Sequence, residues 1–96
     1  MWTEMSDPAI MKTIGGRIKD YRIAMELKQA DLAFQSGVSL STLGKIESGL
    51  PVSTALLLSV LRALGLLENL DLLVPESKVS PLQMLKFQGH KVKRVR

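Results

Sequence analysis

The feature that most constrains this chain is a three-residue turn, Gly37-Val38-Ser39, between two short segments with helical periodicity. Residues 29–36 precede the turn, and the glycine after them is the residue that most often ends a helix. Ser39 is a favourable N-cap for the second segment, which runs to Gly49. Two helices joined by so short a turn must cross at close range.

The small and apolar residues around this turn are placed as such a crossing requires. We expect Ala33 to lie where the two helices nearly touch, because a larger side chain would hold them apart. Val38 and Leu43 are expected to fill the space beneath the turn, and Ile46 to anchor the second helix to the core. Gly37 is expected to adopt the left-handed conformation that glycine adopts without steric cost.

A longer helix is predicted ahead of this pair, because apolar residues recur there at spacings of three and four. They are Ile10, Ile14, Ile18, Tyr21 and Met25. Asp7 is the expected cap and Pro8 suits the first turn. Gly15-Gly16 interrupts the pattern, which indicates either a break or a close approach to another helix.

Two further helices are predicted after Gly49. The first is capped by Ser53 and runs to Gly65, and the second spans residues 67–73. The apolar stripe of the first consists of Leu57, Val60, Leu61 and Leu64. No segment of the body alternates with a period of two over more than a few residues. The expected fold class is therefore all-α, with five helices.

Composition excludes several classes of protein. The chain has no cysteine and one histidine, His90, so neither a catalytic triad nor a thiolate or histidine metal centre is expected. We expect no enzyme activity and no cofactor. The N-terminal residues do not resemble a signal peptide, and the longest uncharged stretch, residues 48–61, is too short to span a bilayer. A cytoplasmic location without membrane attachment is the expectation.

The net charge of +4 is unevenly distributed. Residues 1–85 carry eight basic and nine acidic side chains, whereas residues 86–96 carry five basic and no acidic ones. The body is therefore close to neutral, and the tail supplies the whole excess.

Residues 14–65 resemble the helix-turn-helix domain that lambdoid phage repressors, Cro and the Xre-like bacterial regulators share. The resemblance rests on three motifs in order, which are LKQADLA at 27–33, SGVSLSTLGKIESG at 36–49 and LLSVLRALG at 57–65. It implies a lambda-repressor-like fold with the DNA-binding motif at residues 29–47. The implied function is sequence-specific binding of double-stranded DNA, with the second motif helix in the major groove.

The resemblance also assigns roles to individual residues. Arg22 and Glu47 correspond to a buried ion pair that joins the first helix to the end of the third. Phosphate contacts are implied for Gln29 and Ser48. The residues implied to face bases and the flanking backbone at the start of the recognition helix are Ser39, Leu40, Ser41, Thr42 and Lys45. For Lys45 the plainer interpretation is a solvated surface lysine, and Ser41 and Thr42 could be ordinary first-turn residues.

Three residues depart from the family pattern. Lys28 stands where a Thr or Ser usually caps the helix, a loss of about 1 kcal/mol, although its ammonium group could contact a phosphate. Gly44 lies inside the recognition helix, where glycine costs roughly 0.8–1 kcal/mol relative to alanine. Leu40 replaces a polar residue often used for base readout, and a contact with a thymine methyl is one use for it.

The segment 56–73 holds more leucines than five short helices can enclose. An exposed apolar patch usually marks an interface, so homodimerisation is predicted, although some of these leucines could be plain core. Dimers also suit a palindromic operator with half-sites about 10 base pairs apart. The candidate residues for a dimer or partner interface are Leu66, Leu67, Leu70 and Leu73.

The chain is predicted to comprise a DNA-binding domain, residues 1–74, and a linker with a basic tail, residues 75–96. The tail could be merely solubilising, follow DNA phosphates or bind a protein partner. Residues 73–94 resemble the tails of small HipB-type antitoxins encoded beside HipA-type kinase toxins. That resemblance implies a HipA-like kinase toxin as partner and repression of the shared operon. The alternatives are a stand-alone Xre-like or phage-type repressor, and an interaction module for which DNA binding is secondary.

Overall fold

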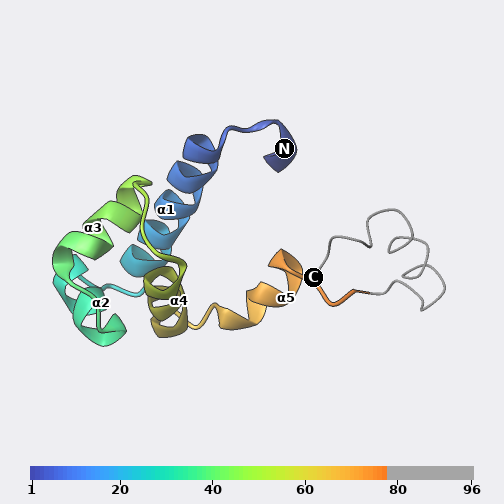
Figure 1. The fold of residues 1–96 in the computed structure, drawn as a ribbon. Coiled ribbons are helices and arrows are strands. Elements are labelled where there is room, and N and C mark those ends of the chain that lie inside the picture. The colour runs from blue at the N-terminus through green and yellow to red at the C-terminus, as the bar shows by residue number, and fades with distance from the viewer. Residues whose placement is uncertain (78–96) are drawn as a thin grey trace, which may run out of the picture.

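The computed structural model of the chain describes residues 1–77 (Figure 1), and this part is built of helices and turns without a strand. A short 3-10 turn, η1 (Trp2–Glu4), precedes the long helix α1 (Asp7–Ala24). The helices α2 (Gln29–Ser36), α3 (Leu40–Ser48) and α4 (Thr54–Ala63) follow. A second 3-10 turn, η2 (Leu67–Asn69), leads into the single helical turn α5 (Leu70–Leu73). The predicted all-α class with five helices is confirmed.

The helix ends follow the capping residues in the sequence, with one correction. The cap of α1 is Ser6, whose hydroxyl accepts a hydrogen bond from the N–H of Ala9 at 3.2 Å, and Asp7 is already the first helical residue. Ser39 and Ser53 cap α3 and α4 as predicted. The expectation of Asp7 was wrong because both residues are good N-caps, and the backbone turns into the helix one residue earlier.

The core lies where α1, α2, α3 and α4 meet. Leu32, Leu43 and Val60 are fully buried, and Ile18, Ala33, Ile46 and Leu64 complete the cluster. Val38 packs against this cluster from beneath the turn, and Gly37 is left-handed with φ 72°. The expected crossing of α2 and α3 is therefore present.

The apolar stripe predicted for α1 is only partly buried. Ile18 lies in the core, whereas Ile14, Tyr21 and Met25 are exposed. The buried residues of α1 are Gly15, Ile18 and Arg22, at spacings of three and four, so the face that packs on the body is rotated away from Ile14 and Tyr21.

Gly15 makes this crossing close. A Cβ at this position would overlap the carbonyl oxygen of Ile46 and lie 2.9 Å from that of Glu47, so only glycine lets the two backbones approach so far. α1 continues unbroken through Gly15-Gly16. Of the two interpretations of this pair, the close approach is correct and the break is not.

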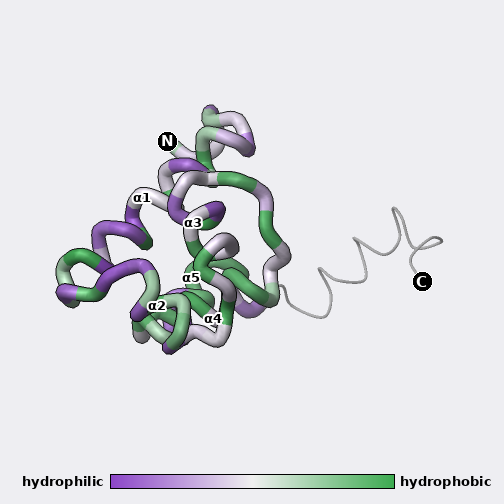
Figure 2. The backbone as a smooth tube through the Cα atoms, turned by 90° about the vertical axis from the view of Figure 1, so that its left-hand side faces the viewer, coloured by the Kyte–Doolittle hydropathy of each residue, from purple (hydrophilic) through white to green (hydrophobic). Residues whose placement is uncertain are grey.

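The segment after α4 extends away from the body (Figure 1), and it continues the strongly hydrophobic character of α4 (Figure 2). Leu66, Leu67 and Leu70 are half-buried, whereas Leu72, Leu73 and Val74 are 71–83% exposed. The fifth helix expected over residues 67–73 is therefore a 3-10 turn followed by one α-helical turn. No helix within residues 1–77 is long and apolar enough to cross a membrane.

The helical glycines give opposite predictions for stability. Gly16 and Gly44 have ordinary helical conformations and nothing within 4 Å of an added Cβ. Each substitution by alanine should therefore raise the free energy of unfolding by about 0.8–1 kcal/mol, measured by urea denaturation. Gly15→Ala should lower it by about 1–3 kcal/mol, because α1 and α3 must move apart. Equal effects at positions 15 and 16 would contradict the close crossing.

Candidate nucleic-acid interface

The turn between α2 and α3 fixes where α3 begins. The hydroxyl of Ser39 accepts a hydrogen bond from the N–H of Thr42 at 3.0 Å and donates one to Thr42 Oγ1 at 2.9 Å. The first free N–H groups of the helix are thereby partly satisfied by the chain itself. Ser39 therefore acts as a cap, and its hydroxyl is already engaged within the fold.

α3 has one buried and one exposed face. Leu43, Ile46 and Glu47 point into the body and are buried. The exposed face of α3 lies opposite these residues and consists of the exposed Leu40, Ser41, Lys45 and Ser48 with the half-buried Gly44 among them. The helix lies at the edge of the body, where this face has no covering element (Figure 1). Four of the residues assigned from the sequence therefore share one accessible surface, and Thr42 is half-buried at its margin.

The start of α2 lies beside the end of α3. Gln29 Nε2 donates a hydrogen bond to Glu47 Oε1 at 3.0 Å, a contact that the sequence did not predict. An amide side chain has two N–H donors and an acceptor oxygen, so Gln29 retains capacity for a second partner. No sequence signal indicates this contact, because it depends on the fold bringing position 29 against position 47.

Lys28 is the N-cap residue of α2, and its ammonium side chain offers no cap acceptor. Asp31 compensates in part, because its carboxylate accepts the N–H of Lys28 at 3.1 Å. The side chains of Lys28 and Lys45 are exposed, and neither forms an ion pair within residues 1–77. Both are therefore available to an external anion.

Arg22 and Glu47 form a two-pronged buried ion pair. Arg22 Nε lies 2.7 Å from Glu47 Oε2, and Nη2 lies 3.1 Å from Oε1. Arg22 Nη1 also donates to the carbonyl oxygen of Leu27 at 2.8 Å. The side chains are 11% and 3% exposed. The hydrogen bonds to Glu47 raise the pKa of Arg22 above its ordinary value, although burial opposes this, so the guanidinium stays charged wherever the protein is folded.

This pair connects three parts of the motif, namely α1, the loop before α2 and the last turn of α3. No buried side-chain nitrogen or oxygen in residues 1–77 lacks a hydrogen-bond partner. The polar network beneath the exposed face of α3 is therefore satisfied, which favours one fixed orientation of that helix.

Residues 18–68, just over half of the chain, match the helix-turn-helix family of Xre and lambda-repressor-like proteins. The chain belongs to this family. Its members are DNA-binding regulators and are generally not enzymes. The match begins within α1 at Ile18, covers α2, the turn, α3 and α4, and ends within η2 at Glu68. No curated protein matches the chain.

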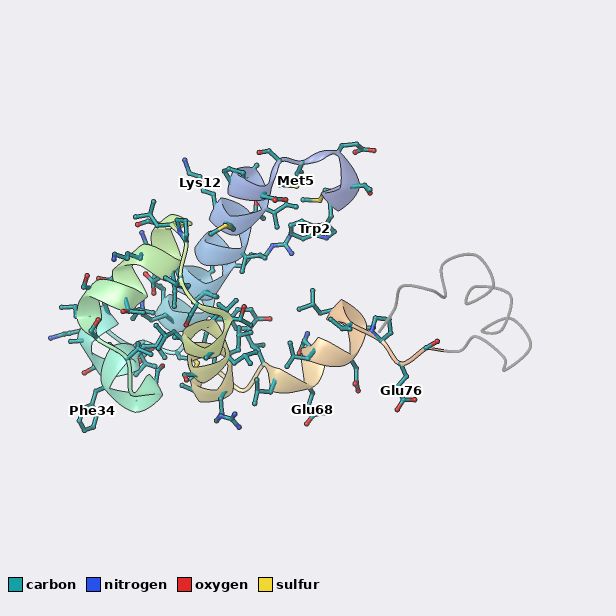
Figure 3. All side chains as sticks on the ribbon, in the orientation of Figure 1. Trp2, Met5, Lys12, Phe34, Glu68 and Glu76 are labelled. Atoms are coloured by element: carbon teal, nitrogen blue, oxygen red, sulfur yellow. The ribbon has the colours of Figure 1, made fainter. Side chains whose placement is uncertain are left out.

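Two further features of this regulator lie away from the exposed face of α3. At the N-terminus, the Arg17 guanidinium lies 4.9 Å from the centre of the Trp2 ring, so η1 folds back on α1 (Figure 3). Phe34 on α2 is 88% exposed and points away from the body (Figure 3). Within residues 1–77, no three His, Cys, Asp or Glu side chains gather as a metal site would require.

Glu47→Gln should destabilise the domain strongly. The amide keeps the shape of the side chain but removes the charge that offsets the buried guanidinium of Arg22, a loss of about 3–5 kcal/mol in the free energy of unfolding. Urea denaturation followed by circular dichroism measures it. Glu68→Gln, at an exposed position on η2, is the matched control and should stay within about 0.5 kcal/mol of the parent. Equal stability of the two variants would contradict the structural role of the pair.

Proposed function

We propose that this regulator is a transcriptional repressor that binds a palindromic operator as a homodimer and blocks access of the polymerase. The exposed face of α3 carries the proposal, because it presents small hydroxyls on a helix without a covering element, together with Lys45, which forms no ion pair within residues 1–77. A helix of this kind fits the major groove of B-form DNA, about 12 Å wide. Membership of the family supports DNA binding as the general activity, and we assign DNA binding to the exposed face of α3.

Within this proposal the residues have different tasks. Ser41 and Lys45 lie four residues apart on the exposed face and reach base edges. Ser39 and Thr42 fix the start of the helix and lie beside the flanking backbone. The phosphate contacts are assigned to Lys28, Gln29 and Ser48. The anchoring of Gln29 to Glu47 supports its role, since a side chain already held in place loses less entropy on binding.

Homodimerisation is proposed through the segment that follows α4. Leu66, Leu67 and Leu70 are half-buried and Leu73 is exposed, so this segment presents apolar surface that the body does not cover. We add Leu72 and Val74 to the candidate interface, because both are more than 75% exposed. An isolated helical turn as short as α5 is not stable alone in water, and a second copy would stabilise it.

The antitoxin role is the finer part of the proposal. Residues 1–74 form the DNA-binding unit, and the segment 75–96 binds a HipA-like kinase toxin. The basis is the sequence resemblance of residues 73–94 together with the five basic side chains of residues 86–96, all of which lie outside the described residues. The difference in charge between the near-neutral body and the basic tail is consistent with separate roles, in which the body binds DNA and the tail binds a protein partner. A stand-alone repressor is the alternative.

Alanine at Ser41 and Lys45 tests the assignment of α3. Each substitution should weaken binding to an operator selected from random duplex DNA by about fivefold or more, because base contacts are worth about 1–3 kcal/mol each. Fluorescence anisotropy measures the affinity. Lys19→Ala removes an exposed charge from α1 and is the matched control, expected to change affinity less than threefold. Unchanged affinity in both α3 variants would refute the assignment.

Leu73→Asp tests the dimer. A charge on the apolar segment should shift the protein from dimer to monomer in sedimentation-velocity experiments and weaken binding to the palindromic operator. Phe34→Asp places the same charge at an exposed apolar position on α2 and should remain dimeric. Dimerisation that is insensitive to Leu73→Asp would exclude this segment as the interface.

The tail is tested with a chain that ends at residue 77. This variant should keep operator binding but lose association with the product of a neighbouring kinase-like gene in a co-purification experiment. Equal recovery of the kinase with both chains would contradict the tail assignment, and absence of any such gene and partner would favour the stand-alone repressor.

A further inference from the structure

Leu40 is an exposed apolar residue that takes no part in the hydrophobic core. It is the first residue of α3, and 53% of its surface is exposed. It belongs neither to the buried core nor to the apolar residues packed around it. Leucine at such a position leaves apolar surface in water unless a partner covers it.

The surroundings of Leu40 leave that surface open. Gly44 follows one helical turn later, and nothing lies within 4 Å of where its Cβ would be. Helical side chains lean toward the N-terminus, so a side chain at position 44 would occupy the space beside Leu40. This glycine is not required by backbone conformation or by a close contact, in contrast to Gly15.

The polar groups nearest in sequence are already engaged. The Ser39 hydroxyl accepts the N–H of Thr42 and donates to Thr42 Oγ1, so the proton of the Ser39 hydroxyl and one lone pair of each hydroxyl are engaged within the fold. At its N-terminal end, the exposed face of α3 therefore offers chiefly apolar surface beside the hydroxyl of Ser41. The C5-methyl of thymine is the apolar group that a standard base pair displays in the major groove.

We propose that Leu40 reads a thymine in each operator half-site by packing against its C5-methyl group, with Gly44 keeping the adjacent space free. This inference rests on the proposed function, since it requires α3 to enter the major groove. It adds a base preference, which is an A·T pair recognised by its methyl group without a hydrogen bond from the side chain.

Thymine-to-uracil replacement isolates this contact, because uracil lacks only the methyl group. The full-length protein is first used to select its site from random duplex DNA. Each thymine of that site is then replaced by deoxyuridine, one position of each half-site at a time. At one position, replacing thymine by deoxyuridine should weaken binding about fourfold per half-site. This is the effect expected when a contact that buries one methyl group is lost.

Variants assign the effect to Leu40. In Leu40→Ala the uracil penalty at that position should fall below about twofold, whereas Leu40→Met, which keeps an apolar side chain of similar length, should retain it. Phe34→Ala, exposed on α2, is the control and should show the parental penalty. Thermal unfolding of each variant verifies that it is folded.

The outcomes separate the two proposals. A selected site without any uracil penalty, or with a penalty unchanged in Leu40→Ala, overturns the thymine contact and leaves the repressor proposal standing. A selection that enriches no sequence overturns both. A single penalty position that is abolished by Leu40→Ala and kept by Leu40→Met supports the contact.

Discussion

The orientation of α3 depends on the buried ion pair between Arg22 and Glu47. The guanidinium comes from α1 and the carboxylate from the last turn of α3, so their two hydrogen bonds fix one helix against the other. Gln29 adds the start of α2 through its hydrogen bond to Glu47. Burying two charges is costly unless each is well paired, and here Arg22 Nη1 also donates a hydrogen bond to the Leu27 carbonyl oxygen. The network therefore supports a single arrangement of the motif.

Glycine at position 15 allows that network to form. Its missing side chain lets the backbone of α1 approach the carbonyl groups of Ile46 and Glu47. The ion pair and the close crossing thus act on the same stretch of α3, one through charge and one through shape. The opposite face of that stretch stays free, which is why a helix so firmly held can still present an accessible surface.

Local signals predicted the turn and its caps, because Gly37 and Ser39 act within a few residues of themselves. The Arg22–Glu47 pairing came from family resemblance, since nothing in the spacing of two residues so far apart indicates contact. The hydrogen bond of Gln29 to Glu47 could not be predicted, because it depends on side-chain positions that only the packed fold defines. Apolar periodicity also misplaced the buried face of α1, since that face includes Gly15 and Arg22, which are not large apolar residues.

The charge distribution agrees with recognition by placed groups more than by a general positive field. Residues 1–77 carry seven basic and nine acidic side chains, so Lys28 and Lys45 belong to a near-neutral body. The binding constant should therefore fall only moderately with salt concentration. Each phosphate contact should add about 0.9 to the steepness of a plot of log binding constant against log salt concentration.

The most direct test of the central claim is an NMR titration of the full-length protein with its selected operator. If α3 is the reading element, the largest shift changes should fall on residues 40–48 and on the start of α2 at Lys28 and Gln29. Changes confined to α1 or to the segment after α4, with α3 unaffected, would contradict it.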